Sequence, residues 1–434
     1  MTRDIVAGSF RVLMRKFRTA VRITRLEGPR ISVRLAQDNL RNILRKHRDR
    51  VAVDPDDGLS ARSTAKTREP ELARTVLVTA EQRLNGAPKR RLSWIVPAPA
   101  PGSGGHRNIF RAVRGLAQRG HDVLVYVVPD RRFASSRDAQ RAIEEWFFNL
   151  QAEVVLGVDA ITPCDLLIAT HWSTAYIAHR HRHRAGQIWY FVQDFEPMFA
   201  PMGMDYILAE RSYQLGFRHI ASGPWCSLML REKFDLDVPF FRFPVDRQVY
   251  HPTAGAQETH ESRRRVIFFA KPEAPRRCYP LGLDALRIVH TTMPDVEIVL
   301  FGSDQVSSSE LGFAHNNVGL IRDLTELARL YQSATVGVAF STTNPSLVPY
   351  EMMACGCPVV DLDYGRNDVN YGGRENVALA GPTGEEVAAA VIDLLRKPER
   401  RRDLARRGLE YVESFPDEEG MVDAVEQILL HLTR

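Results

Sequence analysis

The pattern that most constrains this fold is an alternation of short apolar segments with amphipathic stretches, which runs through the chain twice. Apolar runs that alternate with helical patterns of about ten to fifteen residues are typical of βαβ units and a mostly parallel sheet. The expected strands cover 92–97, 122–128, 165–170, 189–193 and 220–222 in the first round, and 266–270, 296–302, 336–340 and 358–362 in the second. The expected helices cover 108–119, 281–290, 323–332, 349–355 and 384–395.

Two consecutive α/β domains follow from this repetition. We expect one Rossmann-like domain over 89–245 and a second over 246–415, because the proline-containing stretch 244–252 is typical of a linker. A terminal helix over 416–434 could cross back to the first domain. Ligands of parallel sheets bind at the carboxyl ends of the strands, so we expect a site in a cleft between the two domains.

A basic extension, which we expect to be partly helical, precedes this pattern over residues 1–88. Its first fifty residues hold 14 Lys and Arg against 4 Asp and Glu, a net charge of +10. The whole chain has a net charge of +5, so the remaining residues carry a net charge of −5. Arginines alternate there with apolar residues at helical spacing (Val6, Phe10, Leu13, Phe17, Val21). Residues 1–50 could therefore lie on an anionic membrane surface or pack on the first domain as an arm. Nucleic-acid binding is the disfavoured third option, because the aromatic residues of this segment, Phe10 and Phe17, belong to the apolar face of the expected helix.

Composition indicates a globular protein, with 44% hydrophobic and 26% charged residues. No apolar run reaches the length of about eighteen residues that a membrane-spanning helix needs. Arg11 and Arg15 interrupt the first apolar stretch, so we expect no signal peptide and a cytoplasmic protein, peripheral at the inner membrane face if residues 1–50 bind lipid. The five cysteines are odd in number and lack metal-site spacing, which favours reduced, structural thiols.

A glycine-rich turn joins the first expected strand to the first helix. Gly104 and Gly105 allow the backbone to approach an anion, and the start of the following helix offers free N–H groups. The turn matches neither a dinucleotide-binding fingerprint nor a P-loop. A tight turn without function is the alternative.

Three cations follow the first strand of the second domain. Lys271, Arg276 and Arg277 could neutralise a diphosphate at the strand's carboxyl end and stabilise a leaving nucleotide. We expect the prolines between them to keep this loop extended and out of a helix. Gly302, at the end of the next strand, is assigned to the same site. The alternative is a solvated basic loop.

A third candidate joins a buried strand to a short helix near Pro349. Ser346, Leu347 and the nearby amides could hold a phosphate, and Glu351 in the first turns could accept hydrogen bonds from a sugar hydroxyl. Glu near a helix N-terminus is also stabilising without any ligand, and the residues alone do not separate the two interpretations.

The segment 350–360 resembles the C-terminal signature of the GT-B glycosyltransferases of family 4. The turn Gly104-Gly105-His106 and the stretch 120–123 are similar to that family's N-terminal opening. The resemblance covers roughly residues 91–434. More narrowly, 190–199, 271–277 and 344–346 look like the branch that contains the bacterial rhamnosyltransferase WsaF.

This resemblance implies a metal-independent transferase without a cofactor, whose donor is dTDP-L-rhamnose and whose acceptor is a cell-surface glycan or a lipid-linked glycan. A UDP- or GDP-sugar donor, or a non-catalytic glycan-binding protein with this fold, remains the alternative. Glu351 would hold the ribose of the nucleotide. The family's other glutamate is replaced by Thr343, which with Asn344 would face the donor sugar.

Three residues of the first domain complete the candidate site. His171 follows a strand at the place where the family often has a cleft histidine, or is only a polar strand-end residue. Asp194 and Glu196 follow the next strand and could orient the acceptor hydroxyl, with Asp194 as general base if the reaction inverts configuration. A capping role for Asp194 is the alternative. Metal binding is disfavoured at the literal DxD of 361–363 and in the arginine-interleaved histidines of 179–184.

Overall fold

The computed structural model describes residues 89–253, 264–306 and 311–431. The helical extension predicted over residues 1–88 lies outside these described residues. None of the described helices is both long and apolar enough to cross a membrane.

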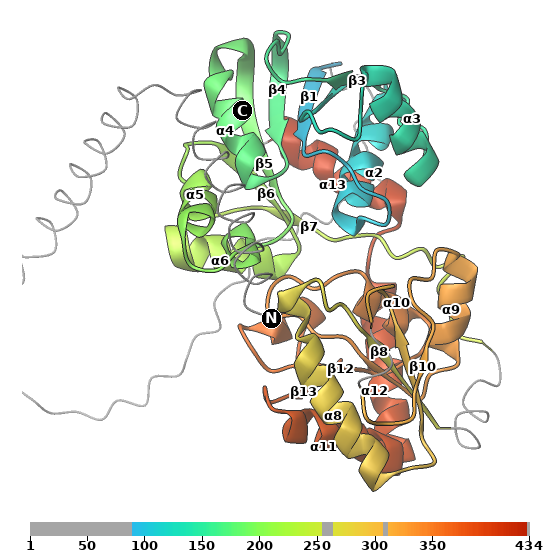
Figure 1. The fold of residues 1–434 in the computed structure, drawn as a ribbon. Helices are drawn as coiled ribbons and strands as arrows, with labels where there is room; N and C mark the ends of the chain where they lie inside the picture. Colours follow the sequence, from blue (N-terminus) through green and yellow to red (C-terminus); the bar gives the residue numbers. More distant parts are fainter. Residues whose placement is uncertain (1–88, 254–263, 307–310, 432–434) are drawn as a thin grey trace, which may run out of the picture. The chain divides into compact units, whose positions relative to one another are not determined.

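The first domain is built on a seven-stranded sheet in which every pair of neighbouring strands is parallel (Figure 1). Its order is β3-β2-β1-β4-β5-β6-β7. The strands are β1 Arg91–Val96, β2 Asp122–Val127, β3 Glu153–Leu156, β4 Cys164–Ala169, β5 Ala185–Val192, β6 Arg218–Ser222 and β7 Phe240–Phe241. The helices between them are α2 Gly104–Gln118, α3 Ser136–Trp146, α4 Trp172–Arg180, α5 Met204–Ser212 and α6 Pro224–Phe234.

The second domain repeats this architecture with six parallel strands in the order β10-β9-β8-β11-β12-β13. The strands are β8 Arg265–Phe269, β9 Glu297–Phe301, β10 Asn316–Asn317, β11 Val336–Val338, β12 Val359–Leu362 and β13 Ala378–Ala380. The helices are α8 Tyr279–Thr292, α9 Leu324–Gln332, α10 Val348–Ala354, α11 Gly384–Arg396, α12 Pro398–Glu413 and α13 Glu418–His431. The prediction of two parallel α/β domains is confirmed.

The central strands are mostly apolar because helices cover both faces of each sheet, although Ser93 of β1 and Asp361 of β12 are buried polar residues. In β1, the side chains from Leu92 to Val96 are fully buried, and in β8 the same holds from Val266 to Phe268. The short strands at the sheet edges, β3, β7, β10 and β13, went unpredicted, because they have only two to four residues each. The helices α3, α4, α5, α6 and α12 also went unpredicted, and in α12 charged residues dominate the sequence.

The last helix, α13, packs against α2 of the first domain (Figure 1). Met421, Val425 and Leu429 are buried in the core that α2 and the first sheet share. At the margin of this contact, His121 Nε2 lies 2.9 Å from Glu426 Oε1. The chain therefore returns to the first domain after completing the second.

Arginines tie together the two segments that connect the domains. Arg242 donates to the Tyr411 hydroxyl at 2.7 Å, and its guanidinium lies over the Phe415 ring. Arg247 donates to the carbonyl oxygens of Glu413 and Phe415, at 2.6 and 2.5 Å. These contacts satisfy carbonyls at the end of α12 that have no partner within the helix.

Candidate functional site

Residues predicted from both domains meet at the carboxyl end of β5. Asp194, the second residue after this strand, is only 7% exposed. Its carboxylate accepts a hydrogen bond from the Thr343 hydroxyl at 2.9 Å and another from the Asn344 backbone N–H at 2.9 Å. Arg276 Nε lies 3.8 Å from the same carboxylate. Four of the predicted site residues thus form one contact group across the two domains.

Asn344 extends this contact to the neighbouring strand of the first sheet. Its side-chain amide donates to the carbonyl oxygens of Gln193 at 2.9 Å and Ser222 at 3.1 Å. Gln193 directly follows β5, and Ser222 is the last residue of β6. The loop between β11 and α10 is therefore held by the strand ends of the first domain.

The cationic loop after β8 differs from its prediction in one respect. It was expected to be extended, but Pro275–Arg277 form a single 3₁₀ turn. Proline fits the first position of such a turn, because its fixed φ suits a helix and its missing N–H has no partner to lose there. The expectation of an extended loop was wrong for these three residues.

Within this loop the three cations have different surroundings. Lys271 Nζ donates to Gly302 O at 3.0 Å and pairs with Glu273 at 2.5 Å, which brings the ends of β8 and β9 together. Arg277 is 7% exposed, and burial next to Arg276 lowers its pKa. The Arg276 guanidinium lies 4.5 Å from the centre of the Phe199 ring of the first domain. The three cations thus lie together after β8, and two of them are paired with carboxylates.

Glu351 lies in the first turn of α10, and its backbone N–H donates to Leu347 O at 2.9 Å. Burial raises the pKa of its carboxyl to about 7, although Arg111 of α2 and the Tyr331 hydroxyl favour the charged form. Tyr331 donates to it at 3.4 Å. Ser346 and Leu347 are partly exposed in the turn before this helix. The turn and Glu351 therefore offer N–H donors and a carboxylate close together.

The glycine turn of the first domain is part of a helix. Gly104 and Gly105 are the first two residues of α2, which begins four residues before its predicted start and has Ser103 as its N-cap. A Cβ at Gly104 would meet nothing within 4 Å, whereas one at Gly105 would lie 3.4 Å from the side-chain amide of Gln193. The space beside Gly104 is open and compatible with a bound anion, whereas the Gln193 side chain lies beside Gly105.

His171 and Glu196 form a second pair in the first domain. His171 is the N-cap of α4, where its Nδ1 accepts from the Ser173 N–H at 3.3 Å, so the proton is on Nε2. Burial lowers the histidine's pKa to about 4. Its Nε2 lies 3.8 Å from Glu196 Oε2, which accepts from the Tyr190 hydroxyl at 2.9 Å. Burial also raises the pKa of Glu196 to about 8, which favours a protonated carboxyl beside the uncharged imidazole.

The residues considered for metal binding have other partners. Asp361 is fully buried and accepts hydrogen bonds from Ser341 N, Asn367 Nδ2 and the Tyr371 hydroxyl. Asp363 forms a bidentate pair with Arg374 at 2.7 and 2.8 Å. Over the described residues, no group of three or more His, Cys, Asp or Glu is arranged to hold a metal ion.

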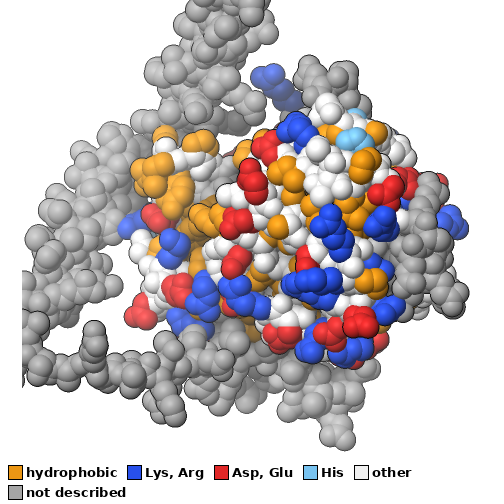
Figure 2. Space-filling model, turned by 90° about the horizontal axis from the view of Figure 1, so that it is seen from below, with side chains coloured by type: hydrophobic (Ala, Val, Ile, Leu, Met, Phe, Trp, Pro, Cys, Tyr) orange, Lys and Arg blue, Asp and Glu red, His pale blue; other side chains and the backbone are white. Residues whose placement is uncertain are grey.

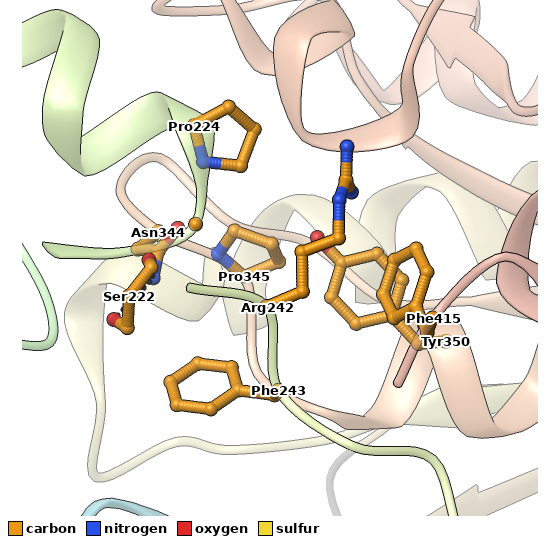
Figure 3. A pocket seen from close by; sticks show the side chains of 9 residues that line it. Ser222, Pro224, Arg242, Phe243, Asn344, Pro345, Tyr350 and Phe415 are labelled. Carbon is orange, nitrogen blue, oxygen red and sulfur yellow. Dashed lines mark hydrogen bonds between the residues drawn. The ribbon is translucent and has the colours of Figure 1, made fainter. Parts of the chain in front are cut away.

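A small pocket lies beside the Asp194 contact group, and Figure 3 shows its lining. The aromatic rings of Tyr350 and Phe415 lie close to Arg242 on one side, while Ser222 and Asn344 lie together on the other. Among the predicted site residues, Asn344 alone lines it. Most of the predicted residues therefore lie outside this pocket.

Sequence reasoning missed several residues of the site. Gln193 and Ser222 are the residues that end two predicted strands, so the strand-end rule could have found them. Arg111 lies on the predicted helix 108–119, but nothing in its spacing indicates that it approaches Glu351. In the sequence Tyr331 looks like an ordinary apolar helix residue, and only the tertiary structure shows that its hydroxyl contacts Glu351.

Comparison with known proteins supports the same architecture. The family model described as "WsaF, C-terminal domain" matches residues 264–392. The chain is similar to the O-antigen biosynthesis protein RfbC of Myxococcus xanthus, with 32% identity over 352 residues, 78% of this chain and 27% of that protein. The chain thus spans about a quarter of the length of this curated relative.

Two solved structures resemble the whole two-domain body. Sucrose-phosphate synthase from Thermosynechococcus elongatus superposes with a TM-score of 0.60 at 17% identity, covering 80% of this chain and 99% of the other. Anabaena HepE, solved in complex with UDP-glucose, has a TM-score of 0.60 at 15% identity, covering 79% and 99%. At this identity the likeness concerns the fold, and the chain has the GT-B fold: two Rossmann-like domains whose strand ends meet at the candidate site.

Proposed function

We propose that this protein is a glycosyltransferase that moves a sugar from a nucleotide diphosphate to a cell-envelope glycan or a lipid-linked glycan. L-Rhamnose carried by dTDP is the donor we favour. The observation that carries the proposal is the meeting of Arg276 and the β11–α10 loop of the second domain with Asp194 of the first, at the carboxyl ends of both sheets.

In this proposal each group has a role. Arg276 and Arg277 would neutralise the diphosphate, with Lys271 beside them, and stabilise the charge that develops as the bond to the sugar breaks. Glu351 would accept hydrogen bonds from the ribose hydroxyls. Uncharged His171 would donate from Nε2 to a hydroxyl or phosphate oxygen in the cleft. No step in this scheme requires a metal ion or a cofactor.

The names of the relatives and the surface of the first domain support the acceptor class. RfbC is named as an O-antigen biosynthesis protein, which is a cell-surface glycan function. Of nine large apolar side chains that are exposed among the described residues, five lie within 198–207. Figure 2 shows orange side chains gathered at the left of the view, the side on which α5 lies in Figure 1. This exposed apolar segment suits an acceptor that is attached to a lipid.

A non-catalytic glycan-binding protein is the competing reading, and one observation favours it. Asp194 is only 7% exposed and its carboxylate accepts three hydrogen bonds from the protein itself, so little of it is open to an acceptor hydroxyl. Transfer therefore has to be measured directly, rather than inferred from ligand binding.

Thermal unfolding of the full chain with dTDP-L-rhamnose, UDP-glucose and GDP-mannose tests the donor. A donor at a hundred times its Kd stabilises by about 2.7 kcal/mol, which corresponds to a rise in Tm of several degrees. We expect this rise with dTDP-L-rhamnose only, and expect Arg277→Met to abolish it. Equal shifts with all three donors would remove the rhamnose assignment.

Release of dTDP, measured with and without a rhamnose-containing oligosaccharide, separates the transferase from the binding protein. We expect release to depend on the oligosaccharide and to yield a product enlarged by one sugar. Binding of the donor without any transfer would favour the binding protein, and neither binding nor transfer with any donor would contradict both.

A further inference from the structure

The carboxylate of Asp194 is shared between the two domains. Oδ1 accepts from the Phe195 N–H of its own loop at 2.8 Å and from the Asn344 N–H of the second domain at 2.9 Å. Oδ2 accepts from the Thr343 hydroxyl at 2.9 Å, and Arg276 Nε lies 3.8 Å away. The residue is 7% exposed, so these contacts replace most of its hydration.

The loop that Asp194 holds is also tied at its base within the second domain. Ser341 donates through its hydroxyl to the carbonyl oxygens of Thr343 and Asn344, at 2.9 and 3.1 Å. The Ser341 N–H in turn donates to Asp361 at 3.0 Å. The base of the loop is therefore fixed by its own domain, while its tip is fixed by the other.

The tip of this loop leads directly to the candidate donor site. Asn344 is followed by Pro345, Ser346 and Leu347, and the last of these accepts the first hydrogen bond from Glu351 in α10. Proline restricts the backbone on both of its sides, so a displacement at Asn344 is transmitted to the following turn rather than absorbed. The position of the tip therefore influences where the turn N–H groups and Glu351 point.

We propose that Asp194 is a positioning residue that couples the approach of the two domains to the geometry of the donor site. Its carboxylate accepts hydrogen bonds from Thr343 and Asn344 where the two domains meet. These hydrogen bonds fix the conformation of the loop that leads into α10. The inference rests on the proposed transferase function for its consequence in catalysis. Its structural half, the coupling of the loop to the first domain, is independent of that function.

The test removes the hydrogen bond between Thr343 and Asp194 and keeps the volume of the Thr343 side chain nearly unchanged. Thr343→Val deletes the donating hydroxyl with little change in volume, and Thr343→Ser keeps it. Thr342→Val is the matched control, since the Thr342 hydroxyl makes only a 3.4 Å contact with Arg276 O. Hydrogen–deuterium exchange of the full-length variants follows segments 341–347 and 193–196, which lie in different domains.

We expect Thr343→Val to speed exchange in both segments, while Thr343→Ser and Thr342→Val leave it unchanged. With dTDP-L-rhamnose as donor, kcat should fall by about ten- to a hundredfold in Thr343→Val, the range expected for losing one hydrogen bond to a charged group. The donor KM should change less than about threefold. Thr343→Ser should restore kcat to within about threefold.

Two results would overturn the proposal. Unchanged exchange in Thr343→Val would show that the contact does not hold the loop, whether or not the chain transfers sugar. Full activity in Thr343→Val together with an inactive Asp194→Asn would show that Asp194 acts on the substrate directly. If the wild-type chain transfers no sugar, the exchange result still decides the structural half, so failure of the proposed function remains distinguishable.

Discussion

Replacing Glu351 by glutamine separates the functional from the structural interpretation of this residue. A carboxylate near a helix N-terminus is ordinarily stabilising, because it interacts favourably with the helix dipole. At Glu351 the opposite should hold at neutral pH, since burial raises the pKa of the carboxyl from 4.5 to about 7. We therefore expect Glu351→Gln to stabilise the folded protein above pH 7.

The size and direction of this stability change follow from the difference in the proton affinity of Glu351 between the folded and the unfolded protein. Between pH 4.5 and about 7 the folded state keeps a proton that the unfolded state has lost, so the stability contributed by this group falls as the pH rises through that window. A tenfold difference in proton affinity is worth about 1.4 kcal/mol, so the full effect is roughly 3 kcal/mol. Glutamine mimics the protonated form and removes this dependence.

Chemical unfolding followed by far-UV circular dichroism at pH 5 and pH 8 measures the effect. We expect Glu351→Gln to exceed the wild type by less than about 1 kcal/mol at pH 5 and by up to roughly 3 kcal/mol at pH 8. Glu399→Gln is the matched control, because Glu399, like Glu351, lies in a first helical turn that contains proline, but it is exposed. The control should show no gain in stability at pH 8.

A difference between Glu351→Gln and the wild type that is the same at both pH values would refute this reasoning. So would an equal gain in the Glu399 control. If Glu351→Gln is more stable at pH 8 but binds dTDP more weakly, then Glu351 destabilises the ligand-free protein and contributes to ligand binding.

Two further predictions concern other parts of the molecule. A Cβ at Gly115 of α2 would lie 2.4 Å from Val422 of α13, so Gly115→Ala should lower Tm by several degrees. Adding Val422→Ala should recover most of this loss. If Tm does not recover, another contact excludes the methyl group. Glu196 should lose its proton near pH 8, so kcat/KM is expected to fall above that pH in the wild type and to stay level in Glu196→Gln. An alkaline fall that persists in the variant would assign it to another group.

Much of the fold could be predicted from the sequence, because the information is local. A buried parallel strand is apolar along most of its length, so the strands at Leu92 to Val96, which includes Ser93, and at Val266 to Phe268 can be recognised without any tertiary contact. The strand-end rule then placed His171 and Asp194 just after β4 and β5, where the structure has them. Short edge strands and the charged helix α12 escaped, since neither leaves a long apolar pattern.

The candidate site was only partly accessible in this way. The sequence places Thr343 where the resemblance leads one to expect a carboxylate, and the structure brings the carboxylate of Asp194 to 2.9 Å from its hydroxyl. These residues are separated by 149 positions, and no pattern along the chain records their distance. The raised pKa of Glu351 likewise depends on burial and on Arg111, which belongs to the other domain.

By itself, the sequence determined the two parallel sheets and the edge at which chemistry would occur, because hydrophobic period and strand ends are properties of single segments. Only the tertiary structure decided which side chains meet there and in which protonation state. Contact and desolvation depend on what the second domain brings against the first, and at Asp194 that neighbour supplies two of the three hydrogen bonds to the carboxylate.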